Sequence, residues 1–259
     1  MLRKRFGQHF LTDRRYIERI VAAIDPRRDE VMIEIGPGGG ALTDPLLQRV
    51  ARLHVVEIDR DLCAALRTRF PAERLEVHEA DALAFDFAAL GDAVRVVGNL
   101  PYNISTPLLF RFVALASHVR DLHFMLQKEV VDRMAAAPST ADYGRLTVML
   151  QHRFRVEKLF EVPPGAFRPP PKVESAVVRL VPRSGTAGDA HIDEKLAQVV
   201  TAGFTKRRKT LRNALAGVCD ANLLERLGVD PKLRPENLSV DDYERIAAAL
   251  QDLVPDPDA

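Results

Sequence analysis

Five short apolar runs, with stretches of helical spacing between them, constrain the fold of this 259-residue chain most strongly. The runs have strand length and occupy residues 31–35, 53–57, 75–78, 94–98 and 122–127. Apolar residues recur with helical period between them, in residues 41–50, 61–70 and 106–116. Strands that alternate with helices predict an α/β fold with a mostly parallel sheet. An N-terminal helix is expected before the first of these strands. Asp13 would cap its start, and it would run to about Ile24.

The alternation weakens after Arg133. Residues 143–151 have a helical pattern, whereas residues 153–160 and 173–181 are typical of strands. A proline-rich stretch, residues 162–172, joins these two strands. We therefore expect them to form an antiparallel hairpin at one edge of the sheet.

A stretch rich in small residues, 184–191, predicts a linker. From Ile192 onward the pattern is helical throughout, and the last residues, 255–259, are expected to fray. The sequence thus predicts a Rossmann-like domain over residues 1–185 and a small all-helical domain over residues 186–259.

The composition is that of a soluble globular protein, with 47% hydrophobic and 28% charged residues. No apolar run is long enough to cross a bilayer, and the basic N-terminus lacks the apolar core of a signal peptide. We expect a cytoplasmic protein, and a monomer because no heptad or dimer seam is visible. Cys63 and Cys219 predict no disulfide, and the seven histidines show no metal-ligand spacing, so no metal is expected.

The net charge of +1 indicates little by itself, but basic residues cluster at two places. One is Arg3–Arg5, and the other consists of Lys206, Arg207, Arg208, Lys209 and Arg212. Each cluster is either a solvated surface or a set of phosphate contacts. Near-neutral charge with local basic patches suits a protein that docks on RNA by one face.

A glycine-rich segment, Glu34-Ile35-Gly36-Pro37-Gly38-Gly39-Gly40-Ala41, follows the first expected strand and opens a helix. Glycines such as Gly36 and Gly38 let the backbone turn tightly and approach a ligand at the carboxyl end of the strand. The segment also matches a dinucleotide fingerprint, with Glu57 at the distance of a ribose-binding acid. The loop alone is compatible with three interpretations: a methyltransferase, an NAD enzyme, or a turn with only a structural role.

Acidic residues follow the next two strands as well. Asp81, after the third strand, can accept a hydrogen bond from the amine of a bound adenine, although alone it would more often be a turn residue. Together with Gly36 and Glu57 it forms a series of a backbone cradle, a ribose acceptor and an adenine acceptor. This order favours S-adenosylmethionine, because no second mononucleotide half is visible for a nicotinamide.

The fourth strand ends in Asn99-Leu100-Pro101-Tyr102. Adenine N6 is a weak nucleophile whose lone pair is delocalised, so it needs acceptors that hold its N–H groups and aim the nitrogen at a methyl carbon. The Asn99 side chain and a backbone carbonyl at Leu100 or Pro101 can accept in this way. Pro101 rigidifies the turn, and Tyr102 offers a ring for stacking a flipped base. Otherwise the segment is a strand-ending turn with a core tyrosine.

These motifs together resemble the ribosomal RNA adenine dimethyltransferase family, and most closely its bacterial small-subunit (16S) branch. The resemblance spans nearly the whole chain in family order. Further matching segments are Phe6-Gly7-Gln8-His9-Phe10-Leu11, Val56-Glu57-Ile58-Asp59, Leu126-Gln127-Lys128-Glu129-Val130, Phe167-Arg168-Pro169-Pro170-Pro171-Lys172-Val173, Ser175-Ala176-Val177-Val178 and Arg207-Arg208-Lys209-Thr210-Leu211-Arg212-Asn213.

The resemblance implies roles for individual residues. His9 and Leu11 would help to cover S-adenosylmethionine, although many relatives carry asparagine at the position of His9. Gly36 would lie against the methionine part, Glu57 would bind the ribose and Asp81 the adenine. Asn99 would lie between cofactor and target, and Phe167 would pack on the target adenine opposite Tyr102. Gly39 stands where relatives often have leucine.

By the same resemblance the enzyme would dimethylate N6 of two adjacent adenines near the 3′ end of 16S rRNA, during ribosome biogenesis. The basic segment Lys206–Arg212 would face this RNA. Two alternatives remain open: a resistance-type dimethyltransferase of large-subunit rRNA, and a catalytically silent RNA-binding assembly factor. An NAD-type oxidoreductase has only the glycine loop in its favour.

Overall fold

The computed structural model describes residues 9–183 and 190–251, and its contacts divide the chain into two compact units. The first unit contains the described residues up to Val131 together with Val156–Pro182, and the second contains Asp132–Arg155 and the described residues from Arg183 onward. The basic cluster Arg3–Arg5, most of the expected linker with the domain boundary near residue 185, and the expected frayed end at 255–259 lie outside the described residues.

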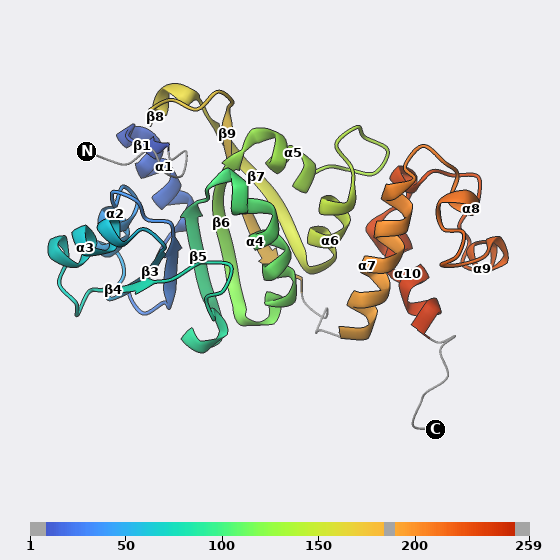
Figure 1. Cartoon of the computed structure of the whole chain (residues 1–259), viewed down its shortest axis with the longest axis horizontal. Helices are drawn as coiled ribbons and strands as arrows, with labels where there is room; N and C mark the ends of the chain where they lie inside the picture. The colour runs from blue at the N-terminus through green and yellow to red at the C-terminus, as the bar shows by residue number, and fades with distance from the viewer. Residues whose placement is uncertain (1–8, 184–189, 252–259) are drawn as a thin grey trace. The chain divides into compact units, whose positions relative to one another are not determined.

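The first unit contains a seven-stranded sheet of strand order β4-β3-β2-β5-β6-β9-β7 (Figure 1). The neighbours from β4 to β6 are parallel, and all five expected strands are among them. Their bounds are Met32–Ile35 (β2), Leu53–Glu57 (β3), Leu75–Glu79 (β4), Val94–Asn99 (β5) and Val119–Gln127 (β6). This arrangement confirms the predicted α/β fold.

The two late strands lie where the sequence places them. Strand β9 (Ser175–Pro182) pairs antiparallel with β6, and β7 (Phe154–Val162) forms the outer edge next to β9. The chain between them contains η3 (Pro164–Ala166) and the short strand β8 (Phe167–Arg168). The antiparallel addition to the parallel sheet is therefore confirmed for β9.

Helices precede, connect and follow the parallel strands. They are α1 (Arg14–Ile24), α2 (Thr43–Leu47), α3 (Arg60–Arg69), η1 (Ala88–Leu90), α4 (Tyr102–Ala114), η2 (Ala116–His118) and α5 (Lys128–Met134). The Asp13 carboxylate accepts from Arg15 N at 3.0 Å and caps α1, as predicted. Helix α2 is shorter than the expected 41–50, because the preceding loop turns back on itself with Gly40 N donating to Pro37 O at 2.9 Å.

Apolar side chains fill both faces of the sheet. On one face Ile20, Val21 and Ile24 of α1 pack in a buried cluster with Leu46 of α2 and Val55 of β3. A second group is a chain of rings in which the centroids of Phe87 and Phe112 lie 5.0 Å apart and those of Phe112 and Phe124 lie 5.7 Å apart. With both faces covered, ligands reach the parallel strands at their ends.

The second unit is helical in its described residues. Its elements are α6 (Arg145–Arg153), α7 (Ala190–Thr205), α8 (Leu211–Ala214), α9 (Ala221–Arg226), η4 (Pro235–Asn237) and α10 (Val240–Gln251). Described residues 190–251 contain no strand, in agreement with the helical pattern from Ile192 onward. Within this unit, the Phe204 ring lies between two buried tyrosines, 6.2 Å from Tyr143 and 6.0 Å from Tyr243.

One segment before the boundary expected near residue 185 groups with the helical unit that follows this boundary. Asp132–Arg155 belongs to the second unit because α6 packs against α7 and α10. The buried His152 imidazole fixes this packing, with Nε2 3.0 Å from Asp193 on α7 and Nδ1 2.7 Å from Glu244 on α10. The chain therefore contributes to the helical unit twice. None of the helices in the described residues is long and apolar enough to cross a membrane.

Candidate active site

A cavity of about 1130 Å³ opens at the carboxyl ends of the parallel strands in the first unit. Its walls come from the segment before α1, the glycine loop after β2, the end of β3, the turn after β4 and the turn between β5 and α4. Open α/β sheets bind their ligands at this position. The volume is sufficient for a nucleoside-bearing cofactor with a base beside it.

The glycine loop lines this cavity with backbone. Gly36 and Gly38 have φ angles of +64° and +55°, a left-handed conformation that side chains disfavour. Gly36 N donates to Val56 O at 2.9 Å and ties the loop to β3. A Cβ atom at Gly38 would lie 3.1 Å from the Phe10 ring, so the ring closes over the loop. The loop thus presents a backbone surface to a ligand.

Glu57, at the end of β3, is buried on the cavity wall. Its Oε1 atom accepts from Ile58 N at 2.9 Å and Asp59 N at 3.0 Å, and Oε2 accepts from Gly38 N at 3.4 Å. Burial raises the pKa of this carboxyl, and the three N–H donors partly oppose the rise. The carboxylate is therefore held in a fixed orientation between β3 and the glycine loop.

Asp81 lies on the cavity wall after β4, with an exposed side chain. Its Oδ1 atom accepts from Leu83 N at 2.8 Å, and its backbone carbonyl accepts from Ala84 N and Phe85 N at 2.9 Å. The residue orders its own turn while facing the cavity. The sequence left a turn residue and a ligand-facing residue as alternatives for Asp81. In the structure Asp81 is both.

Asn99 is the last residue of β5 and lies on the cavity wall. Its Nδ2 atom donates to His9 O at 3.2 Å, which leaves the side-chain oxygen as the acceptor of the amide. Leu100 N donates to Met125 O at 3.1 Å, and Pro101 O accepts from Ile104 N at 3.2 Å. The turn is thus fixed on both sides of Asn99, and of the two candidate carbonyls that of Pro101 already has a partner.

Tyr102 begins α4 and lines the cavity with its ring partly exposed. Its hydroxyl lies 3.3 Å from Ser175 Oγ, and its carbonyl accepts from Ser105 Oγ at 3.0 Å. The His9 ring lies beside it, with centroids 6.2 Å apart and planes inclined by 31°. Two rings from distant parts of the chain therefore meet at one wall.

A two-stranded ribbon holds the N-terminal segment over the cavity. Strand β1 (Phe10–Leu11) pairs antiparallel with β8, so that Leu11 faces Phe167 in register. Thr12 N donates to Ala166 O at 2.8 Å, and His9 Nδ1 donates to Pro169 O at 2.8 Å. His9 and Leu11 both line the cavity, and Leu11 is otherwise buried. The sequence did not predict this ribbon, since each of its strands has only two residues.

Phe167 differs from the other expected site residues. Its side chain is 1% exposed and belongs to the same buried cluster as α1 and Leu11, and the residue is not among those that line the cavity. The structure therefore does not bring this ring opposite Tyr102. Its stacking role stays a prediction from resemblance, and the ring at the wall beside Tyr102 is His9.

Glu34 was part of the glycine motif but had no expected role. It lies in β2, is buried, and lines the cavity, where Thr43 Oγ1 donates to its Oε2 at 2.6 Å. Burial raises the pKa of this carboxyl to about 7, with a further rise from the Glu57 charge and a reduction from the Thr43 hydrogen bond. The one sequence signal for this buried carboxyl was the presence of an acidic residue inside an apolar strand.

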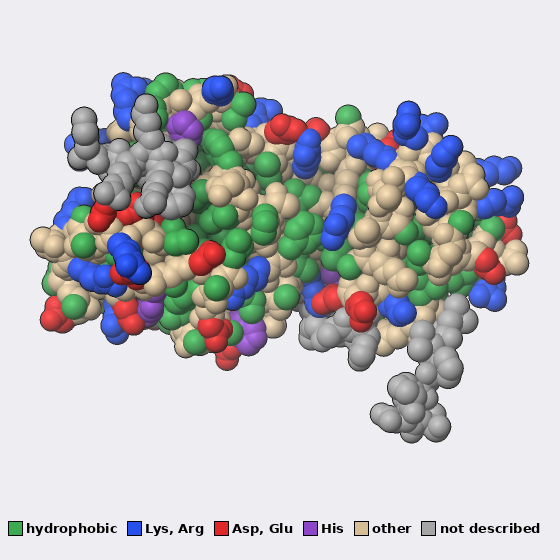
Figure 2. Space-filling model, viewed as in Figure 1, with side chains coloured by type: hydrophobic (Ala, Val, Ile, Leu, Met, Phe, Trp, Pro, Cys, Tyr) green, Lys and Arg blue, Asp and Glu red, His purple; other side chains and the backbone are tan. Residues whose placement is uncertain are grey.

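The basic segment belongs to the second unit, in the turn after α7 and in α8. Lys206, Arg208, Lys209 and Arg212 are exposed. Arg207 instead donates from Nε to Glu236 at 2.5 Å and from Nη2 to Ala141 O at 2.8 Å. Figure 2 shows Lys and Arg side chains gathered over α8 and α9. The structure thus separates four exposed cations from one that holds the unit together.

The glycine loop follows the first parallel strand, a buried acid ends the second, and the Asn-Leu-Pro-Tyr turn begins at the end of the fourth. Together they define an α/β enzyme that binds a nucleoside-bearing cofactor beside a planar substrate. The chain belongs to the ribosomal RNA adenine dimethylase family, whose sequence profile matches residues 1–252. This membership removes the support for an NAD-type oxidoreductase.

Curated relatives and solved structures agree with the family. The chain is 58% identical over 251 residues to the ribosomal RNA small subunit methyltransferase A of Chromobacterium violaceum, covering 96% of each chain. It is 60% identical over 249 residues to the protein of that name in Thiobacillus denitrificans, covering 96% of this chain and 97% of the relative.

Two solved structures are similar over nearly the whole chain. A dimethyladenosine transferase from Plasmodium falciparum has a TM-score of 0.83 and 25% identity, with 94% of this chain and 98% of that chain covered. The 23S rRNA methyltransferase ErmE has a TM-score of 0.73 and 28% identity, with 93% and 99% covered.

Proposed function

We propose that this protein dimethylates N6 of two adjacent adenines near the 3′ end of 16S rRNA, with S-adenosylmethionine as the methyl donor, during assembly of the small ribosomal subunit. The observation that carries the proposal is the rigid Asn99–Tyr102 turn, which places an amide acceptor and a ring at the wall of the strand-tip cavity. The names of the two curated relatives support the small subunit as substrate. The proposed enzyme acts as a monomer in the cytoplasm.

The residues of the cavity fit S-adenosylmethionine. Gly36 and Gly38 present backbone without side chains to the cavity, and the oriented carboxylate of Glu57 suits a ribose diol. Ile58, next to Glu57, is 54% exposed on the cavity wall and offers an apolar surface for a purine. Asp81 stands at the adjacent strand tip, where it can accept from an adenine amine. His9 and Leu11 close the cavity from the N-terminal side.

The bound donor supplies an electrophilic methyl group on a positive sulfonium. In this proposal Asn99 Oδ1 and the Leu100 carbonyl accept the N–H groups of a target adenine and so hold its N6 in position. The bond from Asn99 Nδ2 to His9 O, which leaves Oδ1 as the acceptor, supports this role. The Tyr102 ring, with His9 beside it, provides the surface on which the base stacks. Positioning and electrostatics, without a strong base, account for the acceleration.

The decisive experiment is transfer of labelled methyl groups to undermethylated small subunits, with large subunits in parallel and the product nucleoside identified. We expect N6,N6-dimethyladenosine in small-subunit rRNA alone. Label in large subunits would assign the resistance-type activity instead. Cofactor binding without any transfer to either subunit would support the silent assembly factor.

The role of Asn99 is tested by Asn99→Ala. Loss of the acceptor that aims N6 is expected to lower kcat/KM at least about 100-fold, by analogy with removal of one preorganised polar group from an active site. Calorimetry should show donor affinity within a few-fold of wild type. Asn222→Ala, at an exposed position of α9, is the control. Full turnover by Asn99→Ala would contradict the role.

A further inference from the structure

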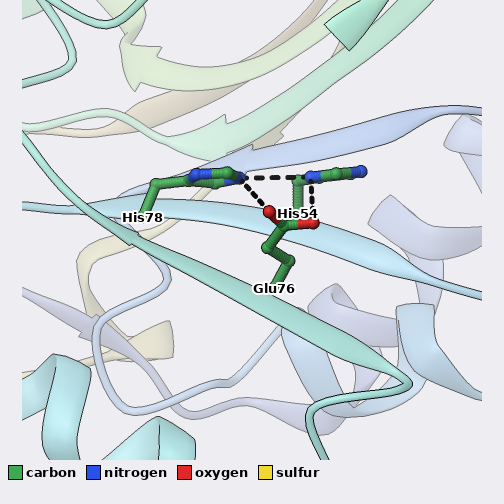
Figure 3. Close-up of side chains that lie close together, drawn as sticks. All are labelled: His54, Glu76 and His78. Carbon is green, nitrogen blue, oxygen red and sulfur yellow. Dashed lines mark hydrogen bonds and ion pairs between the residues drawn. The ribbon is translucent and has the colours of Figure 1, made fainter.

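Two histidines and a glutamate meet on the two outer strands β3 and β4. His54 lies opposite Glu76 in the parallel register, and His78 follows two residues later on β4. Because side chains alternate along a strand, all three project from the same face of the sheet. Figure 3 shows them converging, with the two imidazole rings end to end and the carboxylate below both.

The atoms that face one another are potential metal ligands. His54 Nδ1 lies 3.1 Å from His78 Nε2 and 3.4 Å from Glu76 Oε2, and His78 Nε2 lies 3.9 Å from Glu76 Oε1. Zinc bound tetrahedrally by nitrogen and oxygen at roughly 2.0–2.2 Å requires ligand atoms about 3.3 Å apart. The three groups are therefore spaced as the corners of one face of such a site.

We propose that His54, Glu76 and His78 form a binding site for a divalent transition-metal ion of the zinc class, separate from the methyl-transfer cavity. None of the three residues is among those that line the cavity. Two imidazoles and one carboxylate suit a borderline ion of this class better than Mg²⁺ or Ca²⁺, which prefer oxygen ligands. The fourth position of the ion is left to water.

The protonation of the rings is compatible with this site. A hydrogen bond between His54 Nδ1 and His78 Nε2 requires one of the two nitrogens to carry a lone pair. In the neutral pair one of these nitrogens donates the shared hydrogen and the other accepts it. When the ion binds, the shared hydrogen moves to the other nitrogen of its own ring. Both facing lone pairs then coordinate, and no net proton is released.

The surroundings hold the ligands in place. Arg52 pairs with Glu76 Oε2 at 2.8 Å, which orients the carboxylate and leaves Oε1 toward His78. The Phe85 ring packs on His78 with centroids 4.9 Å apart and covers one side of the cluster. All three side chains remain partly exposed, so an ion can enter from solvent. The Arg52 cation opposes the ion, and the site is expected to be of moderate affinity.

An ion at this place would join the edge strand β4 to β3. Strand β3 ends at Glu57 and β4 ends two residues before Asp81, so a bound ion would stabilise the side of the cavity that these strands form. Binding to the folded chain alone raises Tm, by about 5 °C when the free ion is at roughly 100 times its Kd.

The test is titration of the untagged, full-length chain with Zn²⁺ by calorimetry, with Tm followed in parallel. We expect one ion per chain and a rise in Tm. His54→Asn and His78→Asn should each weaken binding at least tenfold. His118→Asn is the matched control, since His118 also stands near a carboxylate, with Nδ1 3.4 Å from Asp92. It should bind as wild type does, and Tm in EDTA shows that each variant is folded.

Substitution of Co²⁺ gives an independent readout. Nitrogen and oxygen ligands should produce the visible bands of tetrahedral cobalt, without a sulfur charge-transfer band. Such a band would place the ion at Cys63 or Cys219 and overturn the proposal. It would equally be overturned if wild type bound no stoichiometric ion, or if the His54 and His78 variants retained wild-type affinity. The three residues would then be a hydrogen-bonded surface cluster.

Discussion

At the scale of single residues, the sheet leaves no space for a side chain at Gly98, just before the Asn-Leu-Pro-Tyr turn. A Cβ atom there would lie 2.5 Å from Ile35 O on the neighbouring strand β2. Backbone, unlike the end of a flexible side chain, cannot move aside without disturbing the strand pairing. Gly98 therefore sets the close approach of β2 and β5 on which both the glycine loop and Asn99 depend.

Gly98→Ala is expected to lower the free energy of unfolding by about 1–3 kcal/mol, the usual cost of overpacking a well-packed core. Urea unfolding followed by circular dichroism measures the loss. The control is Gly39→Ala, where a Cβ atom meets nothing within 4 Å, and it should be neutral or slightly stabilising. Equal stability of the two variants would show that β2 and β5 can separate at no cost.

Glu34 is expected to make stability depend on pH. Its pKa is about 7 in the folded chain against an ordinary value of 4.5, so between these values the folded chain holds a proton that the unfolded chain has lost. The free energy of unfolding therefore falls as pH rises through this window, by about 3 kcal/mol. Glu57, whose pKa is also raised, adds a change of the same sign.

Glu34→Gln should remove most of this fall, because the amide stays neutral and its oxygen can still accept from Thr43. Urea unfolding of the chain without cofactor, at several pH values from 5 to 8, measures the profile. Glu157→Gln, at an exposed position of β7, should keep the wild-type profile. A profile for Glu34→Gln that still falls as in wild type would assign the pH dependence to other groups.

At the scale of elements, the β1–β8 ribbon connects the N-terminal segment to the chain that precedes β9. Each strand has two residues, so the pairing has few backbone hydrogen bonds of its own. Its stability comes from Leu11 and Phe167, which are 4% and 1% exposed in the main core. Through this ribbon, side chains in the core hold His9 at the cavity wall.

Phe167→Ala should therefore destabilise the chain by about 3–5 kcal/mol, as expected for a large cavity in a core. Phe167→Leu should cost less than about 1.5 kcal/mol, because it conserves most of the volume. Urea unfolding and methyl transfer are measured for both. Near-normal transfer by Phe167→Leu would assign the ring to packing, whereas a stable but inactive Phe167→Leu would support stacking on the target base.

At the scale of the whole molecule, a near-neutral chain must bind a polyanion through local charge. Lys206, Arg208, Lys209 and Arg212 are exposed together in the helical unit, whereas Arg207 is engaged with Glu236 and a carbonyl. Each phosphate contact releases counterions and adds roughly 0.7–0.9 to the slope of log affinity against log salt. The salt dependence of binding can therefore count the contacts.

Arg208→Ala/Lys209→Ala is expected to weaken binding to small-subunit rRNA and to reduce this salt slope by about 1–2. Filter binding over a range of salt concentrations measures it. Arg27→Ala/Arg28→Ala removes the same charge from exposed positions before β2, at the strand ends opposite the cavity, and should leave the slope unchanged. An unaltered slope in the first variant would place the RNA elsewhere on the chain.

The sequence by itself determined the elements and the chemistry of the strand tips. Apolar runs of strand length, the Asp13 cap and the position of each strand before its motif are local properties, so the parallel sheet and the residues from Gly36 to Tyr102 could be predicted from spacing. The carboxyl ends of parallel strands meet at one edge, and for this reason a linear order of motifs predicted a common site.

Only the tertiary structure decided what depends on contacts between distant residues. Register across β3 and β4 brings His54 to Glu76 and His78, where the sequence predicted no metal site. Packing against α7 and α10 assigns α6 to the helical unit. Burial turns Glu34 from a motif residue into a carboxyl with a pKa of about 7, and it removes Phe167 from the cavity wall. Strand register and depth of burial are properties of the assembled chain, and a local pattern specifies them only in part.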